Sequence, residues 1–270
     1  MDTKLDQLEG ILRQTGGVMV AFSAGVDSTF LLKVAHSVLG DQAVALTASS
    51  PTVAPGELDA AKEFTGGLGC RHIVVDSHEL ANPSFSQNPA NRCFFCKDEL
   101  YRICRDQARQ IGINVIVDGT NLDDLKDHRP GLKAANAFGI RHPLVEAALT
   151  KNDIRRYSRE LSLPTWDKPS SPCLSSRFPY GTEINLERLK KIAACEVFLK
   201  ELRFREFRVR YHGDLARIEV APGEIERLME KNTREAVVRR FKEVGFNYVS
   251  LDMQGYRTGS MNEALAAKPG

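Results

Sequence analysis

The stretch AFSAGVDST, at residues 21–29, decides the fold of this chain. It continues the apolar run GVMVAF (17–22) and leads into a helical pattern over 27–39, so a loop of small residues joins a buried strand to a helix. The backbone N–H groups of such a loop and the positive end of the helix dipole favour a bound polyanion. The loop has neither the spacing nor the following lysine of a GxxxxGKS/T loop, so another phosphate-binding motif is expected.

The residue types of this loop suit a polyphosphate. We expect the site to include Ser23, Gly25, Val26, Asp27 and Ser28. Ser23 and Ser28 add hydroxyl donors, and Gly25 lets a ligand approach the backbone closely. Asp27 fits an anion site only together with a cation, so it is predicted either to hold Mg²⁺ between phosphates or to cap the helix. The alternative for the whole stretch is an ordinary capped helix after a strand.

The first half of the chain repeats this strand–helix rhythm. Apolar runs predict strands at 17–22, 43–48, 72–76 and 114–119, with helices near 27–39, 55–68 and 95–111. This alternation is typical of an α/β fold with a parallel sheet and right-handed crossovers.

A nucleotide on such a sheet lies across the carboxyl ends of the strands. Thr47 and Ser49 lie at the end of the second predicted strand, and Gly119 and Thr120 lie at the end of the fourth. We therefore add these residues to the nucleotide site, where backbone groups would recognise adenine. A plain turn with a helix cap explains DGTN (118–121) equally well.

The segment LPTWDKPSSPCLSSRFPYG (163–181) is too rich in proline and serine for a regular element. A different pattern follows it, with an amphipathic helix over 185–203, strands at 207–212 and 215–221, helices near 223–243 and a last strand, NYVSLDM. We expect a nucleotide-binding domain at 1–165, a cysteine-bearing active-site loop at 166–182 and a small α+β substrate-binding domain at 183–270.

Two arginines share one face of the predicted strand FRVRYH (207–212). Arg208 and Arg210 are two positions apart, so their side chains leave the strand on the same side, about 7 Å apart. Two guanidinium groups at that spacing suit a phosphate. The alternative is a solvated outer face of a small sheet.

The bulk composition narrows the class of partner. The chain has 270 residues and a net charge of +2, which does not require a nucleic acid as partner. No run of about 18 apolar residues is present, and the start MDTKLDQLEG has no signal-peptide pattern. We therefore expect a cytoplasmic protein with no membrane partner.

Cysteines supply the second chemical signal. In a chain without a signal peptide they are expected to be reduced thiols, ligands or nucleophiles. The motif NRCFFCK (91–97) places Cys93 and Cys96 near the start of a helix, and Cys173 lies in the 163–181 segment. A CxxC pair there suits a redox pair, half a zinc site or part of an iron–sulfur site, and three thiolates can hold a 4Fe–4S cluster with one open iron position. The alternative is a pair of reduced core thiols, which is also what we expect of Cys70, Cys104 and Cys195.

Longer motifs resemble known families. The pattern SxGxDS after a first strand resembles the PP-loop of the N-type ATP pyrophosphatases, with Ala24 in place of the usual first glycine. The motifs PSSPCLSSRFPYGT (169–182), HRPGLKAA (128–135), RVRYHGDLARIE (208–219) and GYRTGSMNEAL (255–265) resemble the LarE sulfurtransferases, which make the nickel-pincer nucleotide cofactor. The resemblance covers essentially the whole chain.

The LarE resemblance implies a substrate and a reaction. The expected substrate is pyridinium-3,5-biscarboxylic acid mononucleotide, whose carboxylate is adenylated by ATP with Mg²⁺ before sulfur displaces AMP. It also implies that Arg208, Arg210 and Arg257 hold the substrate phosphate, that Arg177 assists catalysis beside Cys173, and that Arg129 assists nucleotide binding. A homo-oligomer, typically a hexamer in this family, is implied as well.

The family resemblance also implies two possible sulfur sources. In one branch the cysteine at the position of Cys173 gives up its sulfur and ends as dehydroalanine. In the other branch three cysteines, here Cys93, Cys96 and Cys173, hold a 4Fe–4S cluster that delivers sulfide from an external donor. The CxxC motif favours the second branch. Rival functions are a tRNA thiolase, an amidating PP-loop enzyme and a nucleotide sensor without turnover.

Overall fold

The chain forms two compact units. The computed structural model describes residues 3–126, 131–257 and 259–260. The first unit takes in the described residues of Met1–Ser50, Gly56–Phe85 and Asn91–Ser171, and the second takes in those of Pro51–Pro55, Ser86–Ala90 and Pro172–Gly270. The main division falls within the 166–182 segment, whereas the two short segments of the second unit have no signal in the sequence.

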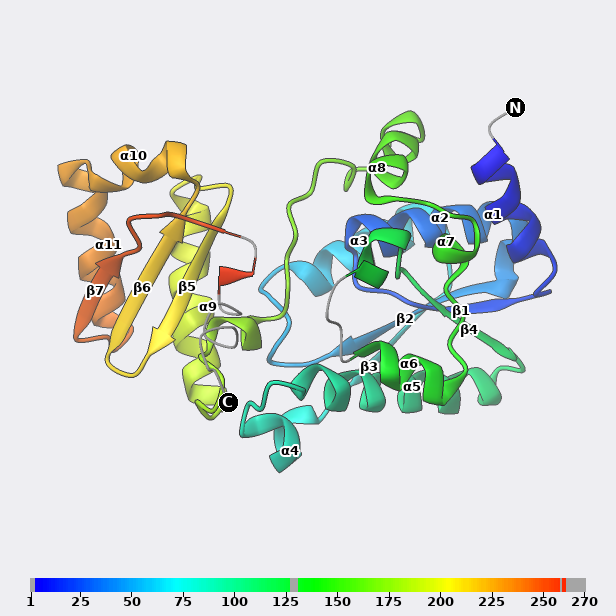
Figure 1. The fold of residues 1–270 in the computed structure, drawn as a ribbon, viewed down its shortest axis with the longest axis horizontal. Helices are drawn as coiled ribbons and strands as arrows, with labels where there is room; N and C mark the ends of the chain where they lie inside the picture. The colour runs from blue at the N-terminus through cyan, green and yellow to red at the C-terminus, as the bar shows by residue number, and fades with distance from the viewer. Residues whose placement is uncertain (1–2, 127–130, 258, 261–270) are drawn as a thin grey trace. The chain divides into compact units, whose positions relative to one another are not determined.

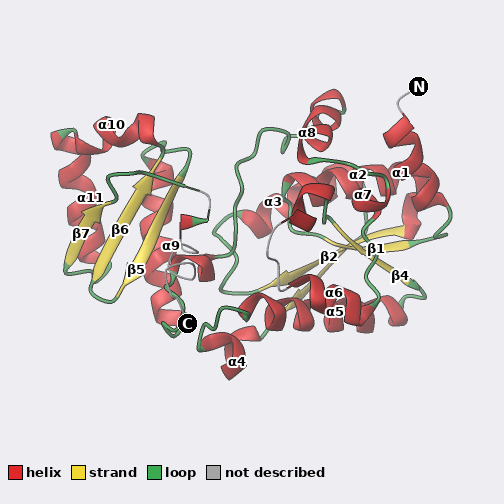
Figure 2. Ribbon diagram, in the orientation of Figure 1, coloured by secondary structure: helices red, strands yellow, loops and turns green. Residues whose placement is uncertain are grey.

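A parallel sheet forms the centre of the first unit (Figures 1 and 2). Its strands lie in the order β3-β2-β1-β4, and every neighbouring pair is parallel. They are β1 (Val18–Ala21), β2 (Ala43–Ser49), β3 (His72–Asp76) and β4 (Val115–Asp118). Each strand falls on one of the predicted apolar runs, so the predicted α/β fold is confirmed.

Successive residues of β1 enter different hydrophobic cores. Val18 and Val20 pack with residues of α1 (Thr3–Arg13), α2 (Val26–Leu39), α3 (Glu57–Leu68), α7 (Pro143–Glu146) and α8 (Lys151–Glu160). Met19 and Ala21 pack on the other face with residues of α5 (Arg92–Gln110) and α6 (Gly131–Phe138). A short further helix, α4 (Pro83–Ser86), lies between β3 and α5 in the sequence. Helices on both faces explain why the strands are continuous apolar runs.

The end of β4 approaches the start of α2 very closely. A Cβ atom added to Gly119 would lie 2.8 Å from the backbone nitrogen of Ser28 and 3.2 Å from Cβ of Asp27. The lack of a side chain at Gly119 therefore lets the first turn of α2 approach the end of β4.

The second unit combines helices with a mixed sheet in the order β5-β6-β7. Strands β5 (Phe207–His212) and β6 (Leu215–Val220) are antiparallel, whereas β7 (Tyr248–Leu251) pairs with β6 in parallel. Helix α9 (Leu186–Glu201) packs against β5, and α11 (Lys231–Glu243) packs against α9 and β7, with α10 (Ile225–Met229) preceding α11. The small α+β unit that the sequence predicts is therefore present.

Two short segments from the first half of the chain complete the second unit. The carbonyl of Thr52 accepts a hydrogen bond from the Leu174 N–H at 2.8 Å. The side chain of Asn88 donates to the carbonyls of Phe178 and Pro179 at 3.3 and 2.8 Å, and its own carbonyl accepts from the Gly181 N–H. These bonds hold the part of the loop that follows Cys173, at Leu174 and again between Phe178 and Gly181. Among the described residues, no helix is both long enough and apolar enough to cross a bilayer.

The Gly119 contact generates a prediction about stability. We expect Gly119→Ala to lower the free energy of unfolding by about 1–3 kcal/mol, because the added methyl would meet backbone atoms that cannot turn away. Gly10→Ala is the matched control, since Gly10 lies in α1 with no atom within 4 Å of an added Cβ. That change should stabilise the protein by roughly 0.5–1 kcal/mol. Urea unfolding of both variants checks the pair, and equal effects would contradict the close approach.

Candidate functional site

Hydroxyl groups close the loop between β1 and α2. The hydroxyl oxygens of Ser23 and Ser28 lie 3.1 Å apart, and Ser28 Oγ also accepts from the Ser23 N–H at 3.3 Å. Gly25 is the N-cap of α2, and no side chain caps the helix there. The alternative role of Asp27 as a helix cap is therefore wrong, and so is the interpretation of the stretch as an ordinary capped helix.

Ala24 stands where PP-loops usually have glycine, and the backbone shows why glycine is usual. Its φ is 53°, in the left-handed region that residues other than glycine rarely adopt. The residue is also buried. The loop therefore keeps the glycine-type conformation even with alanine, at a cost in strain.

Asp27 is engaged by groups from two later segments. Nζ of Lys151, the first residue of α8, lies 2.6 Å from Asp27 Oδ2. The side-chain amide of Asn121 donates to Asp27 Oδ1 at 3.3 Å. The acid in the expected anion site is thus balanced by a cation that belongs to the protein. Sequence reasoning missed Lys151, because no local motif relates it to a loop more than a hundred residues earlier.

A second lysine that sequence reasoning missed contacts the same loop. Nζ of Lys168 donates to the carbonyl of Ala24 at 3.0 Å and lies 2.6 Å from Glu57 Oε2. Arg155 holds the neighbouring backbone by donating to the carbonyls of Trp166 and Lys168. The loop is therefore contacted by lysines from two separate segments of the first unit.

Thr47 uses its side chain inside the protein. Its hydroxyl donates to the carbonyl of Phe22 at 2.9 Å and lies 2.8 Å from His72 Nε2, while His72 Nδ1 lies 3.0 Å from the Thr65 hydroxyl. Burial and the charge of Lys62 lower the pKa of His72. This chain of bonds holds the end of β1 where the loop begins, and it engages the Thr47 hydroxyl inside the protein.

Asp118 is the most strongly bonded acid at the end of β4. Its oxygens accept from the Tyr101 hydroxyl at 2.6 Å, from the Thr120 N–H at 3.0 Å and lie 2.7 Å from His142 Nδ1. Burial raises the pKa of this carboxyl, but the His142 bond, the charge of Lys97 and the Tyr101 bond outweigh burial and hold the pKa well below its usual range.

The turn DGTN does contain a cap. The Asn121 side-chain oxygen accepts from the N–H groups of Asp123 and Asp124, which begin the short helix Leu122–Lys126. Ser49 is partly exposed, and its carbonyl accepts from the Ser77 N–H. Arg129 lies outside the described residues. Adenine binding by Ser49, Gly119, Thr120 and Arg129 stays a prediction.

The cysteines fall into two groups by burial. Cys70, Cys104 and Cys195 are buried, as predicted, and burial raises the pKa of Cys104 and that of Cys195 to about 12. Cys93 is exposed and Cys96 is partly exposed in the first turns of α5, and Cys173 is partly exposed just before the short helix Leu174–Arg177. The interpretation of Cys93 and Cys96 as core thiols is therefore wrong.

The structure does not assemble a metal centre from these thiols. Within the described ranges, no group of three or more Cys, His, Asp or Glu side chains is arranged to hold a metal ion. Cys93 and Cys96 belong to the first unit and Cys173 to the second. What supports a soft metal ligand set is the donor chemistry alone, since these are the three cysteines that are not buried.

Arg177 anchors the loop that contains Cys173. Its guanidinium makes a bidentate ion pair with Glu196 of α9, with both N–O distances at 2.9 Å. Nη1 also donates to the carbonyls of Pro172 and Cys173 at 2.8 and 3.2 Å. Glu196 in turn accepts from the Val209 N–H of β5. Arg177 is 2% exposed, so the geometry gives it a positioning role, and direct catalysis by it stays a prediction.

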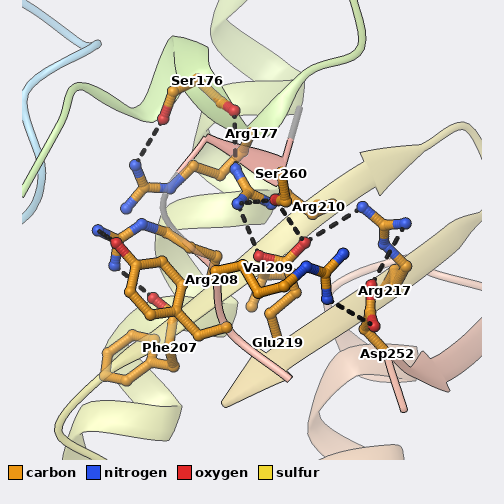
Figure 3. A network of polar contacts seen from close by, with 12 residues as sticks. Ser176, Arg177, Phe207, Arg208, Val209, Arg210, Arg217, Glu219, Asp252 and Ser260 are labelled. Atoms are coloured by element: carbon orange, nitrogen blue, oxygen red, sulfur yellow. Dashed lines mark hydrogen bonds and ion pairs between the residues drawn. The ribbon is translucent and has the colours of Figure 1, made fainter. Parts of the chain in front are cut away.

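The two arginines of β5 are buried rather than solvated. Arg208 is 8% and Arg210 is 5% exposed, so the alternative of a solvated sheet face is wrong. Arg210 pairs with Glu219 at 2.6 Å and donates to the carbonyl of Ser176 and the hydroxyl of Ser260, both at 3.0 Å (Figure 3). The β5 strand is thereby joined directly to the cysteine loop.

The guanidinium groups of Arg177 and Arg210 lie near Arg208. Burial and the nearby charge of Arg177 lower the pKa of the Arg208 guanidinium, and Arg210 contributes in the same direction. Tyr256 lies beneath it, with the ring centre 4.8 Å from Cζ. Arg257 follows Tyr256 and lies 3.5 Å from Asp252. An anion beside Arg208 would relieve this repulsion, which suits a phosphate.

Comparisons with known proteins show which sequences this chain is similar to. The pyridinium-3,5-bisthiocarboxylic acid mononucleotide synthase of Lactiplantibacillus plantarum is 37% identical over 97% of this chain and 95% of its own length. An uncharacterized protein of Synechocystis sp. is 43% identical over 98% of this chain and 99% of its own length. A GMP synthase of Latilactobacillus sakei is 26% identical over 72% of this chain and 41% of its own length. None of the family models compared with the chain matches it.

The small-residue loop at the carboxyl edge of a parallel sheet, with GMP synthases among the relatives, defines an enzyme of the ATP-using PP-loop class. Within that class the chain belongs to the LarE family, the family of the pyridinium-3,5-bisthiocarboxylic acid mononucleotide synthase. The predicted resemblance to this family is confirmed. The sulfur source is a separate question.

The Arg177–Glu196 pair leads to a prediction about stability. We expect Glu196→Ala to lower the free energy of unfolding by about 3–5 kcal/mol, because it leaves a buried guanidinium without its carboxylate. Glu187→Ala is the matched control on the same helix, since the Glu187 side chain is 78% exposed and its ion pair with Lys191 should contribute less than about 1 kcal/mol. Urea midpoints measure both. Similar midpoints for the two variants would contradict the anchoring role.

The bonds to Asp118 lead to a prediction about pH. Because the folded-state pKa is depressed, ionised Asp118 contributes stability that is fully present above the ordinary carboxyl pKa of about 3.9 and is lost as the pH falls below it. We therefore expect the stability difference between the natural protein and Asp118→Asn to shrink steadily in acid. Unfolding free energies measured at a series of pH values test this, and a difference that does not change with pH would exclude it.

Proposed function

We propose that this protein catalyses the ATP-dependent transfer of sulfur to pyridinium-3,5-biscarboxylic acid mononucleotide, giving the thiocarboxylate precursor of the nickel-pincer cofactor. One observation carries the proposal beyond family membership. Arg210, from the strand expected to hold the substrate phosphate, donates to the Ser176 carbonyl in the loop of Cys173. The expected phosphate site and the expected sulfur site are therefore parts of one bonded assembly in the second unit.

The loop after β1 would serve the first chemical step. A substrate carboxylate oxygen attacks the α-phosphorus of ATP, a P–O bond to the β-phosphate breaks, and pyrophosphate leaves with the electron pair. The N–H groups at the start of α2 and the hydroxyls of Ser23 and Ser28 would hold the polyphosphate. Asp27 is proposed to hold Mg²⁺, whose charge would offset that of the phosphates. Adenylation converts a poor electrophile into one that carries a good leaving group.

The residues on the second unit would serve the second step. Arg208, Arg210 and Arg257 are proposed to hold the substrate phosphate, and the lowering of the Arg208 pKa by its arginine neighbours supports an anion there. A sulfur nucleophile then attacks the acyl carbon, and the C–O bond to AMP breaks. A second round on the other carboxylate gives the bisthiocarboxylate.

Three cysteines are proposed to hold a 4Fe–4S cluster, and the cluster is proposed to supply the sulfur. Cys93, Cys96 and Cys173 are suited as ligands because they alone are not buried, whereas the high pKa of Cys104 and of Cys195 keeps those thiols protonated. Such a cluster would supply an exchangeable sulfide. The alternative is that Cys173 attacks the acyl adenylate itself and loses its sulfur by β-elimination, which leaves dehydroalanine.

Further features of the proposal rest on the family resemblance or on the composition of the chain. A homo-oligomer, the absence of a nucleic-acid partner and a cytoplasmic location stay predictions. An external sulfur donor is required by the cluster route and not by the sacrificial one. An amide product formed from ammonia is the outcome that would place the protein with the amidating PP-loop enzymes.

The test is a turnover assay with purified protein under anaerobic conditions. Substrate, ATP, Mg²⁺ and sulfide are supplied, and AMP, pyrophosphate and thiocarboxylate are measured together with iron and acid-labile sulfide. Thiocarboxylate in excess over protein supports the cluster route. At most one sulfur per chain, with Cys173 converted to dehydroalanine by mass spectrometry, supports the sacrificial route. Pyrophosphate release without thiocarboxylate would overturn the proposed sulfur transfer.

Cysteine variants generate a separate prediction. We expect Cys93→Ala and Cys96→Ala each to abolish repeated turnover and to remove bound iron, while ATP–pyrophosphate exchange with the substrate persists. Cys195→Ala is the control, because that thiol is buried in the core of the second unit and its loss should leave turnover intact. Full iron content in Cys93→Ala would contradict the proposed ligand set.

A further inference from the structure

The PP-loop of this chain has no cation of its own, yet it ends beside one. The sequence after Ser28 continues Thr29-Phe30-Leu31 without a basic residue. In the folded chain Lys151 Nζ lies 2.6 Å from Asp27 Oδ2, in the first turn of α2. The Lys151 side chain is 38% exposed, so the ion pair lies at the surface of the first unit and not in its core.

The backbone fixes Lys151 from both directions. Its N–H donates to Asp123 Oδ2 at 2.9 Å. The residue before it, Thr150, forms a reciprocal capping box with Asp153 at the start of α8. The Leu122 N–H donates to the Leu149 carbonyl, which ties the same stretch to the turn after β4. The position of the ammonium group is therefore set by the fold and not by the Asp27 pair alone.

We propose that Lys151 is a polyphosphate-binding residue of the nucleotide site. The inference rests on the proposed use of ATP by this loop. When a polyphosphate enters, the ammonium donates to its oxygens, and Asp27 is released to a cation that accompanies the nucleotide. An exposed lysine–carboxylate pair is weak enough to exchange in this way. Charge that develops on pyrophosphate as the P–O bond breaks is then met by Lys151.

The test compares two variants, each of which removes one lysine charge and one lysine–carboxylate ion pair. Lys4 pairs with Asp153 at 2.6 Å in the same unit, with exposures of 35% and 20% that match those of Lys151 and Asp27, 38% and 22%. Binding of pyrophosphate and of ATP with Mg²⁺ is measured by titration calorimetry for Lys151→Met and Lys4→Met. We expect Lys151→Met to weaken binding about ten- to a hundredfold, and Lys4→Met to leave it within about twofold.

A second comparison, made in the Asp27→Asn variant, removes the effect of leaving the Asp27 carboxylate without its lysine partner. In Asp27→Asn protein without Mg²⁺, adding Lys151→Met should still weaken pyrophosphate binding about tenfold if the ammonium contacts the ligand. Equal affinity of Asp27→Asn and the double variant would overturn the inference, and so would equal affinity of Lys151→Met and the natural protein. Failure of the natural protein to bind either ligand would overturn ATP use itself, whereas normal binding without thiocarboxylate would leave this inference standing.

Discussion

The buried ion pair between Arg177 and Glu196 is the interaction on which the second unit depends. Glu196 lies on α9, accepts from the β5 backbone and accepts from Nε and Nη2 of Arg177, whose Nη1 donates to the carbonyls of Pro172 and Cys173. A helix, a strand and a loop thus share one carboxylate. If the loop left this position, the Arg177–Glu196 pair would break. A buried charge without its partner costs several kcal/mol, so the pair holds the loop in place. A loop with too few apolar residues for a core is ordered by charge instead.

The first unit uses charge in the opposite way. The pair of Asp27 with Lys151 is partly exposed, and so is that of Lys168 with Glu57. Both pairs are more exposed than the Arg177–Glu196 pair, so separating them costs less free energy. The cysteine loop is therefore held by buried pairs, whereas the pairs beside the loop after β1 are partly open to water.

Local patterns predicted most of the fold, because strands, helices and the phosphate loop are each encoded within about ten residues. The assignment of Cys70, Cys104 and Cys195 to the core followed from the same patterns. The partners of the charged residues could not be predicted in this way. Lys151 is 124 positions from Asp27 along the chain, and Asn88 is 90 positions from the Phe178 carbonyl that it bonds. Nor could the pattern show that the glycine after β4 accommodates a backbone, since that depends on two elements meeting in space.

The second unit contains two short pieces from the first half of the chain, at Pro51–Pro55 and Ser86–Ala90. Their partners in the cysteine loop are made by the ribosome about a hundred residues later, after the whole parallel sheet has emerged. Asn88 has a left-handed backbone conformation in the folded chain. The carbonyls that accept from its side chain are synthesised about ninety residues later, so these hydrogen bonds can form only after that. The order of synthesis therefore separates the two units in time: the parallel sheet can assemble on the nascent chain before the cysteine loop has been made.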